Sequence, residues 1–107
     1  MAYEDSLSAL ADPTRRLVLE TLARAPSPVG VLAGQLPVSR PAVSQHLRVL
    51  SDAGLVQVRG EGTRRIYAVR PEGLAELRAY LDRFWDDVMS RFAEAAQAEE
   101  MSHDDTD

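Results

Sequence analysis

Proline placement limits the folds open to this chain more than any other feature. The 107 residues hold six prolines, and five of them lie between residues 13 and 41. Proline lacks a backbone donor and its ring clashes with the preceding turn, so it begins a helix or ends one. We therefore expect only short helices before residue 53. A long helix is possible only after Pro71, beyond which no proline occurs.

Apolar residues recur at helical spacing between these prolines. Residues 3–10 form the first expected helix, and Asp12 followed by Pro13 begins a second that ends near Arg24. The core-facing positions of this second helix are Leu17, Val18, Thr21, Leu22 and Ala25. Ser27 is the expected N-cap of a short third helix. The buried face of that third helix consists of Val29, Leu32, Ala33 and Leu36.

A fourth helix and a hairpin follow. Ser39 caps the fourth helix, which we expect to reach Ala53, with Gly54 as a left-handed C-cap. Its inward face carries Val43, Leu47 and Leu50. Two β-prone runs, residues 55–59 and 65–69, are then joined by the glycine-containing residues 60–63. Runs joined in this way predict a β-hairpin.

The last expected helix runs from about Glu72 to about Ala98 and carries one apolar stripe. It would be roughly 40 Å long, whereas a domain of this size has a radius of gyration of only about 13 Å. The helix therefore cannot bury its whole stripe on its own core. We expect this stripe to form an interface with a second copy of the chain, through these residues: Leu77, Leu81, Phe84, Trp85, Val88 and Phe92. A ligand pocket lined by Phe84, Trp85 and Phe92 is the alternative.

The predicted fold class is mainly α with a small β-hairpin, a winged helix-turn-helix with added N- and C-terminal dimerisation helices. Residues 1–98 would form a single domain, and the acidic residues 99–107 a disordered tail. The chain has no cysteine, which excludes disulfides, thiolate catalysis and cysteine-based metal sites. It has no secretory signal and no membrane-length apolar stretch, so we expect a cytoplasmic protein without membrane contacts.

Charge is segregated along the chain although the net value is −5. Residues 39–70 carry six arginines against Asp52 and Glu61, a net +4, whereas residues 71–107 have a net charge of −8. A basic middle can bind a polyanion while the acidic ends stay away from it. Every basic residue is arginine, whose planar fork suits phosphate and guanine contacts.

These features predict double-stranded DNA as the partner. A capped helix of this length fits a major groove, and an arginine-bearing hairpin can reach an adjacent phosphate or the minor groove. Arg40 and Gln45 are the expected base readers, and Ser44 would contact a phosphate or a base edge. Ser39 is first an N-cap and only second a phosphate contact. The full expected contact set is Ser39, Arg40, Pro41, Ser44, Gln45, His46, Arg48, Arg59, Arg64 and Arg65.

Four of these positions keep alternatives. His46 lies at the core boundary, so its imidazole could bond to the backbone or to a phosphate instead of reading a base. Arg64 and Arg65 are adjacent in a strand, so one of them should point away from the DNA. Arg59 could pair with Glu61 instead of with DNA.

Four strings resemble the ArsR family of bacterial winged-helix repressors: ADPTRR at 11–16, VSRPAVSQHLRVL at 38–50, AGLV at 53–56 and RGEGTRRIY at 59–67. The resemblance spans nearly everything from Leu7 to Phe92. It implies a homodimer built from the first and last helices, in which Tyr3, Leu7 and Leu10 of the first helix join the stripe of the last helix at the interface. It also implies that this dimer binds a near-palindromic operator, blocks transcription and releases DNA when an inducer binds. Metal-sensing members carry Cys-Val-Cys where this chain has Pro28-Val29-Gly30, and the last helix to about Ala98 offers no histidine ligand. We therefore expect the metal-independent branch, with no metal or other cofactor.

Two other function classes were weighed. A winged-helix adaptor for protein partners would show acids or large apolar groups on the outward face of the fourth helix, and residues 39–48 have neither. An enzyme would need a nucleophile motif, a phosphate loop or a convergent histidine–carboxylate set, and the sequence has none of them. The sequence leaves open the operator, the existence of a small-molecule inducer, and activation besides repression.

Overall fold

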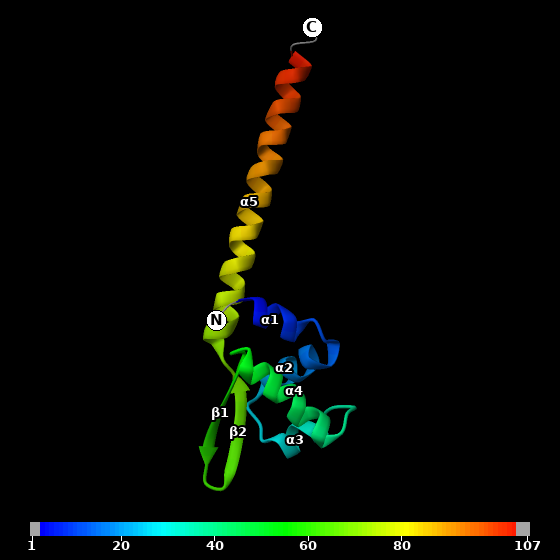
Figure 1. Ribbon diagram of the computed structural model, residues 1–107, viewed down its shortest axis with the longest axis vertical. Coiled ribbons are helices and arrows are strands. Elements are labelled where there is room, and N and C mark those ends of the chain that lie inside the picture. Colours follow the sequence, from blue (N-terminus) through cyan, green and yellow to red (C-terminus); the bar gives the residue numbers. More distant parts are fainter. Residues whose placement is uncertain (1–2, 105–107) are drawn as a thin grey trace. The chain divides into compact units, whose positions relative to one another are not determined.

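The computed structural model describes the backbone of residues 3–104 and the side chains of residues 4–100. Within this part the chain forms helices and one antiparallel hairpin (Figure 1). In chain order the elements are α1 (Tyr3–Leu10), α2 (Pro13–Arg24), α3 (Val29–Gly34), α4 (Arg40–Asp52), β1 (Val56–Glu61), β2 (Arg64–Val69) and α5 (Pro71–Asp104). The predicted fold class, a winged helix-turn-helix, is confirmed.

Contacts divide the chain after Leu77 into two units. The first unit holds α1 to α4, the hairpin and the opening turns of α5, and the second is the rest of α5. The predicted end of the last helix near Ala98 is wrong, because α5 continues to Asp104. Residues 95–101 are alanine, glutamine, glutamate and methionine, all strong helix formers, so nothing local ends the helix there. The last residues of the expected tail, 105–107, lie outside the described part.

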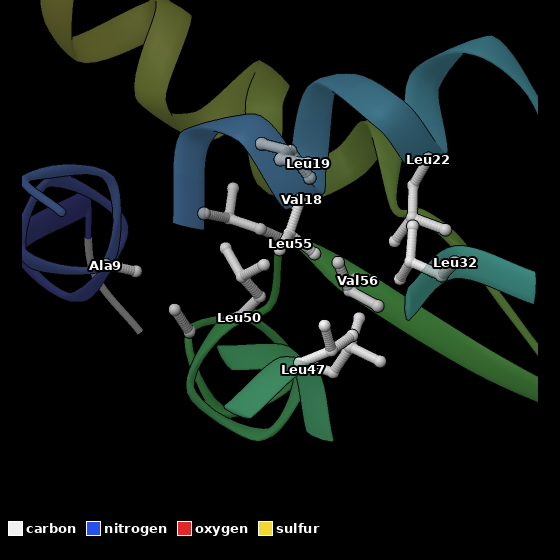
Figure 2. Packing of buried hydrophobic residues seen from close by; sticks show 11 residues of the cluster. Ala9, Val18, Leu19, Leu22, Leu32, Leu47, Leu50, Leu55 and Val56 are labelled. Carbon is white, nitrogen blue, oxygen red and sulfur yellow. The ribbon is translucent and has the colours of Figure 1, made fainter. Parts of the chain in front are cut away.

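The core of the first unit lies between α2, α3, α4 and β1 (Figure 2). Its fully buried side chains are Val18, Leu22, Leu32, Val43, Leu47, Leu50 and Leu55. The predicted inward face of α4 is confirmed. On α2 the prediction is wrong at two positions, because Leu19 is buried and Ala25 is exposed. Ala25 follows the helix in extended backbone, so helical periodicity no longer places it.

Both ends of α4 are closed as the sequence predicted. The Ser39 hydroxyl accepts a hydrogen bond from the Ala42 N–H at 3.3 Å. At the other end Gly54 has a φ of 79°, and its N–H donates to the Ser51 carbonyl at 3.0 Å. The Leu55 N–H then donates to the Leu50 carbonyl at 2.9 Å, which completes a Schellman motif. These caps fix where the helix starts and where the chain turns into β1.

The hairpin has longer strands and a tighter turn than predicted. Glu61 pairs with Arg64, so only Gly62 and Thr63 form the turn. Gly62 has a φ of 66°, and no non-glycine residue in the described chain has a positive φ. A positive φ at the first turn residue alone is the pattern of a type II′ turn, which suits twisted strands.

Ser27 does not cap α3 as predicted. Its N–H donates to the Tyr67 carbonyl at 3.0 Å, and the Tyr67 N–H donates back at 2.9 Å. The Ser27 hydroxyl instead donates to the Ala25 carbonyl, and Pro28 takes the N-cap position without a side-chain bond. Pairing with β2 holds Ser27 in extended backbone and joins the hairpin to the start of α3.

Candidate nucleic-acid interface

The outward face of α4 is polar and basic. Six predicted contact residues are exposed there: Ser39, Arg40, Pro41, Ser44, Gln45 and Arg48. His46 is half-buried, as its position at the edge of the core face predicted. The first acid on α4 is Asp52, at the end of the helix. Its first three turns therefore present hydrogen-bonding groups and positive charge without a competing carboxylate.

A groove of about 470 Å³ separates the start of α4 from the hairpin. Arg40 and Ser44 line it from α4, and residues 63–65 and Tyr67 line it from the hairpin. Residues 28–30, at the start of α3, form the rest of the lining. Two predicted regions, the fourth helix and the wing, thus share one concave surface.

Arg40 lies folded back over α3. A Cβ placed on Gly30 would lie 3.6 Å from one terminal nitrogen of Arg40 and 3.7 Å from its guanidinium carbon. The guanidinium therefore covers the bare backbone of Gly30, inside the groove. Sequence reasoning gave Arg40 a role in base readout but could not find this contact, because it joins two helices through a residue without a side chain.

The wing arginines differ in their surroundings. The register places Arg64 on the same face of the hairpin as Arg59 and Glu61, and Arg65 on the opposite face, as alternation along a strand predicted. Arg65 lies over the ring of Tyr67, with its guanidinium carbon 6.0 Å from the ring centroid. Arg59 pairs with Glu61 at 3.5 Å, the alternative that the sequence had left open.

Positive charge on this surface is largely uncompensated. Within the described chain, Arg40, Arg48, Arg64 and Arg65 make no hydrogen bond or ion pair to protein, whereas Glu61 is engaged by Arg59. Arg70, the remaining arginine of the basic segment, donates to the Gly54 carbonyl at 3.2 Å and so supports the end of α4. Four arginines are therefore available to bind an anion.

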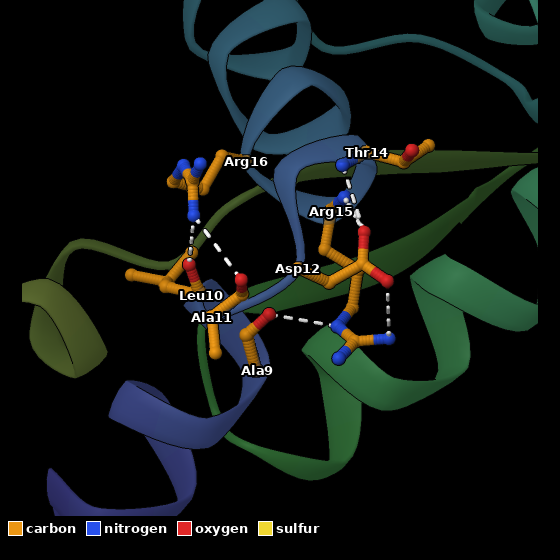
Figure 3. A network of polar contacts seen from close by, with 7 residues as sticks. All are labelled: Ala9, Leu10, Ala11, Asp12, Thr14, Arg15 and Arg16. Atoms are coloured by element: carbon orange, nitrogen blue, oxygen red, sulfur yellow. Dashed lines mark hydrogen bonds and ion pairs between the residues drawn. The ribbon is translucent and has the colours of Figure 1, made fainter.

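Arg15 and Arg16 join α1 to α2 (Figure 3). Arg15 Nε donates to the Ala9 carbonyl at 2.7 Å, and Arg16 donates to the Leu10 carbonyl at 2.8 Å. They close the C-terminal carbonyls of α1, and Arg15 also forms an ion pair with the Asp12 carboxylate at 3.6 Å. The sequence shows two adjacent arginines here but not the helix end that they reach.

Asp12 organises the same junction. Its carboxylate accepts hydrogen bonds from the Thr14 N–H at 2.7 Å and the Arg15 N–H at 3.2 Å. The N–H of Arg15 holds the pKa of Asp12 below its ordinary value, with help from the N–H of Thr14 and from the charges of Arg15 and His46, while burial acts in the opposite direction. The α2 cap thus lies within electrostatic reach of α4.

An apolar face on α5 remains uncovered in the single chain. Leu81, Phe84, Trp85 and Phe92 are 49%, 58%, 62% and 67% exposed, and Val88 is half-buried. Of the other predicted interface residues, Leu7 is exposed, Leu10 packs partly against the core, and Leu77 is buried. The side chain of Tyr3 lies outside the described residues.

No helix among the described residues is both long and apolar enough to cross a membrane. No group of three or more histidine, cysteine or acidic side chains is arranged there to hold a metal ion.

The chain is similar to known regulators over most of its length. A helix-turn-helix domain family matches residues 10–59. The HTH-type transcriptional regulator Rv2034 of Mycobacterium tuberculosis is 56% identical over 91 residues, which cover 85% of each chain. An ArsR-like transcriptional regulator from Rhodococcus sp. RHA1 has a similar structure, with a TM-score of 0.81, 33% identity and coverage of 88% of this chain and 89% of that one.

A further solved relative is a homodimeric winged helix-turn-helix DNA-binding domain from Mycobacterium bovis, described as a possible ArsR-family regulator. It is 31% identical, with a TM-score of 0.64 and coverage of 78% of each chain. The fold, the basic face of α4 beside the wing, and these relatives lead to one conclusion: this chain belongs to the ArsR family of winged helix-turn-helix transcriptional regulators.

Proposed function

We propose that this regulator binds a near-palindromic operator as a homodimer and represses transcription by excluding polymerase from the promoter. The observation that carries the proposal is the outward face of α4, which has no acid before Asp52, beside a wing in which Arg64 and Arg65 are not paired with a carboxylate. A helix of this size enters the major groove, and a hairpin beside it reaches the flanking backbone or minor groove. A regulator of a bacterial operator works in the cytoplasm.

The proposed division of contacts follows the side chains. The Gln45 amide contacts adenine, and the Arg48 guanidinium contacts guanine or phosphate. The Ser44 hydroxyl contacts a base edge or a phosphate. Ser39 and Pro41 bring the N-terminal turn of α4 close to the backbone, where the positive end of the helix dipole favours phosphate. From the wing, Arg65 contacts the flanking strand, because it shares its face of the hairpin with Tyr67 in the groove, whereas Arg64 lies on the opposite face. His46 has one edge in the protein core, so we assign it a supporting contact and not base readout.

The homodimer is proposed from the apolar face of α5 and, separately, from the exposed Leu7 of α1. Phe84, Trp85 and Phe92 are each more than half exposed, an arrangement that a second copy of the chain would bury. The homodimeric relative supports this assembly. Two-fold symmetry then places two α4 helices about one turn of DNA apart, which requires a near-palindromic operator. The proposal needs no metal, other cofactor or catalytic group, and an inducer remains a possible addition.

The test is duplex binding by the wild-type protein and by a Gln45→Ala variant. A preferred duplex is first selected from a pool of random-sequence duplexes, and its affinity is compared with that of a scrambled duplex. We expect the wild type to prefer the selected duplex by about 10³-fold or more. Gln45→Ala should lose about tenfold or more of that preference, because one bidentate contact supplies about 1–3 kcal/mol at each half-site.

The matched control is Gln97→Ala, which removes the same side chain from an exposed position on α5. It should bind both duplexes like the wild type. Equal affinity of the wild type for the selected and scrambled duplexes would overturn sequence-specific binding and favour an adaptor for a protein partner.

A further inference from the structure

The groove between α4 and the wing does not have the shape of a base-reading surface. Base edges lie at the floor of a DNA groove, so only protruding protein elements reach them. The groove is concave, with helix on one side and hairpin on the other. The ridge of DNA that fits a concave surface is the sugar–phosphate backbone. This step rests on the proposed function, since it takes duplex DNA as the ligand.

The position of Arg40 inside this groove fits a phosphate and not a base. Its guanidinium lies over Gly30 of α3, with all three of its terminal atoms within 4.0 Å of where a Cβ would stand. Arg64 and Arg65 line the same groove from the wing, and Ser44 and Thr63 add hydroxyls. Within the described chain none of the three guanidinium groups is neutralised by a carboxylate.

We propose that Arg40 and Arg65 clamp one phosphodiester segment of the operator strand in this groove, and that Arg40 therefore contributes to affinity and not to base specificity. Gly30 forms the floor of the clamp, and a carboxylate placed there would compete with phosphate for the Arg40 guanidinium. This replaces the base-reading role that the sequence had indicated for Arg40.

A matched pair of substitutions at Gly30 tests the clamp. Gly30 is exposed, lies in α3 and has no positive φ, so a side chain there is compatible with the fold. Gly30→Glu places a carboxylate beside the Arg40 guanidinium, whereas Gly30→Gln adds the same bulk without charge. One phosphate contact accounts for about 0.9 in the slope of log affinity against log salt, or about eightfold in affinity at 0.1 M salt. For a dimer with two clamps, the Glu variant should bind about 60-fold more weakly than the Gln variant.

The clamp also predicts which duplexes lose affinity. Gly30→Glu and Arg40→Ala should weaken binding to the selected and scrambled duplexes by the same factor and flatten the salt dependence of both. The base preference recovered by selection should be the same as for the wild type. Circular dichroism of each variant checks that the fold is retained.

Three outcomes separate the claims. Equal affinities and salt slopes for Gly30→Glu and Gly30→Gln would overturn the clamp while leaving the proposed function standing. A changed base preference in Arg40→Ala, with scrambled-duplex binding intact, would restore Arg40 as a base reader and overturn the inference. A wild-type protein that binds no duplex would overturn the proposed function itself, and the clamp with it.

Discussion

Replacing Gly73 with alanine tests the contact that joins the start of α5 to the end of α4. A Cβ placed on Gly73 would lie 2.0 Å from the Gly54 carbonyl oxygen and 2.9 Å from its carbon. Because Cβ atoms do not approach other atoms within 3.0 Å, the two backbone segments would have to separate by about 1 Å. Gly54 cannot simply rotate away, since its φ of 79° closes the Schellman motif.

Separating these two backbone segments lowers the free energy of unfolding through two losses, and the helix propensity of alanine offsets part of them. Overpacking of this kind costs about 1–3 kcal/mol, and the upper value applies because both partners are backbone. Separation also lengthens the 3.2 Å hydrogen bond from Arg70 to the Gly54 carbonyl, a loss of about 1 kcal/mol. Alanine regains about 1 kcal/mol of helix propensity. The free energy of unfolding should therefore fall by about 3 kcal/mol, and Tm by at least about 10 °C.

Urea unfolding followed by circular dichroism measures this difference, at a fixed protomer concentration because association contributes to stability. Gly34→Ala is the control, since a Cβ at Gly34 meets nothing within 4 Å. We expect alanine at Gly34 to leave stability unchanged or to raise it slightly. A Gly73→Ala protein as stable as the wild type would refute the close packing of α5 against Gly54.

Two further predictions concern the dimer and pH. Trp85→Ala should raise the dimer dissociation constant about 30-fold or more, because truncating a buried interface aromatic costs about 2 kcal/mol or more. Sedimentation over a range of protein concentrations measures this constant. An unchanged dissociation constant would argue against this interface. Asp12→Asn keeps a capping oxygen but removes the titration. Because folding lowers the pKa of Asp12, its carboxylate contributes stability that is fully present at pH values above the ordinary pKa of aspartate. This stability is lost as the pH falls through the lower pKa of the folded state. The wild type should therefore lose stability relative to Asp12→Asn below about pH 4, and parallel pH–stability curves for the two proteins would contradict the cap.

Local signals predicted the elements that form the interface. Ser39 caps α4 and Gly54 ends it because each makes bonds within a few residues, so their roles are visible in the sequence. The alternation of Arg64 and Arg65 follows from the geometry of a strand. The exposed apolar face of α5 was predicted from length alone, since the helix exceeds what its own domain can cover.

Contacts between distant elements were not predictable in the same way. Serine is a favoured N-cap residue, but the backbone of Ser27 is paired with the carbonyl and the N–H of Tyr67, which lies far along the chain. Arg15 and Arg16 look like surface residues until α1 folds back beside them. Gly30 and Gly73 have no side chain to mark them, and their importance comes from the Arg40 guanidinium and the Gly54 carbonyl that approach them.

The salt dependence of wild-type binding to the selected duplex tests the central claim most directly. Within the described part of each protomer, four arginines make no hydrogen bond or ion pair to protein, Arg40, Arg48, Arg64 and Arg65, and so a dimer offers eight. If six to eight of them contact phosphate, log affinity should fall against log salt with a slope between about −5 and −7. A slope near zero for a folded dimer would contradict the account, because the basic face of α4 and the wing would then not be where DNA binds.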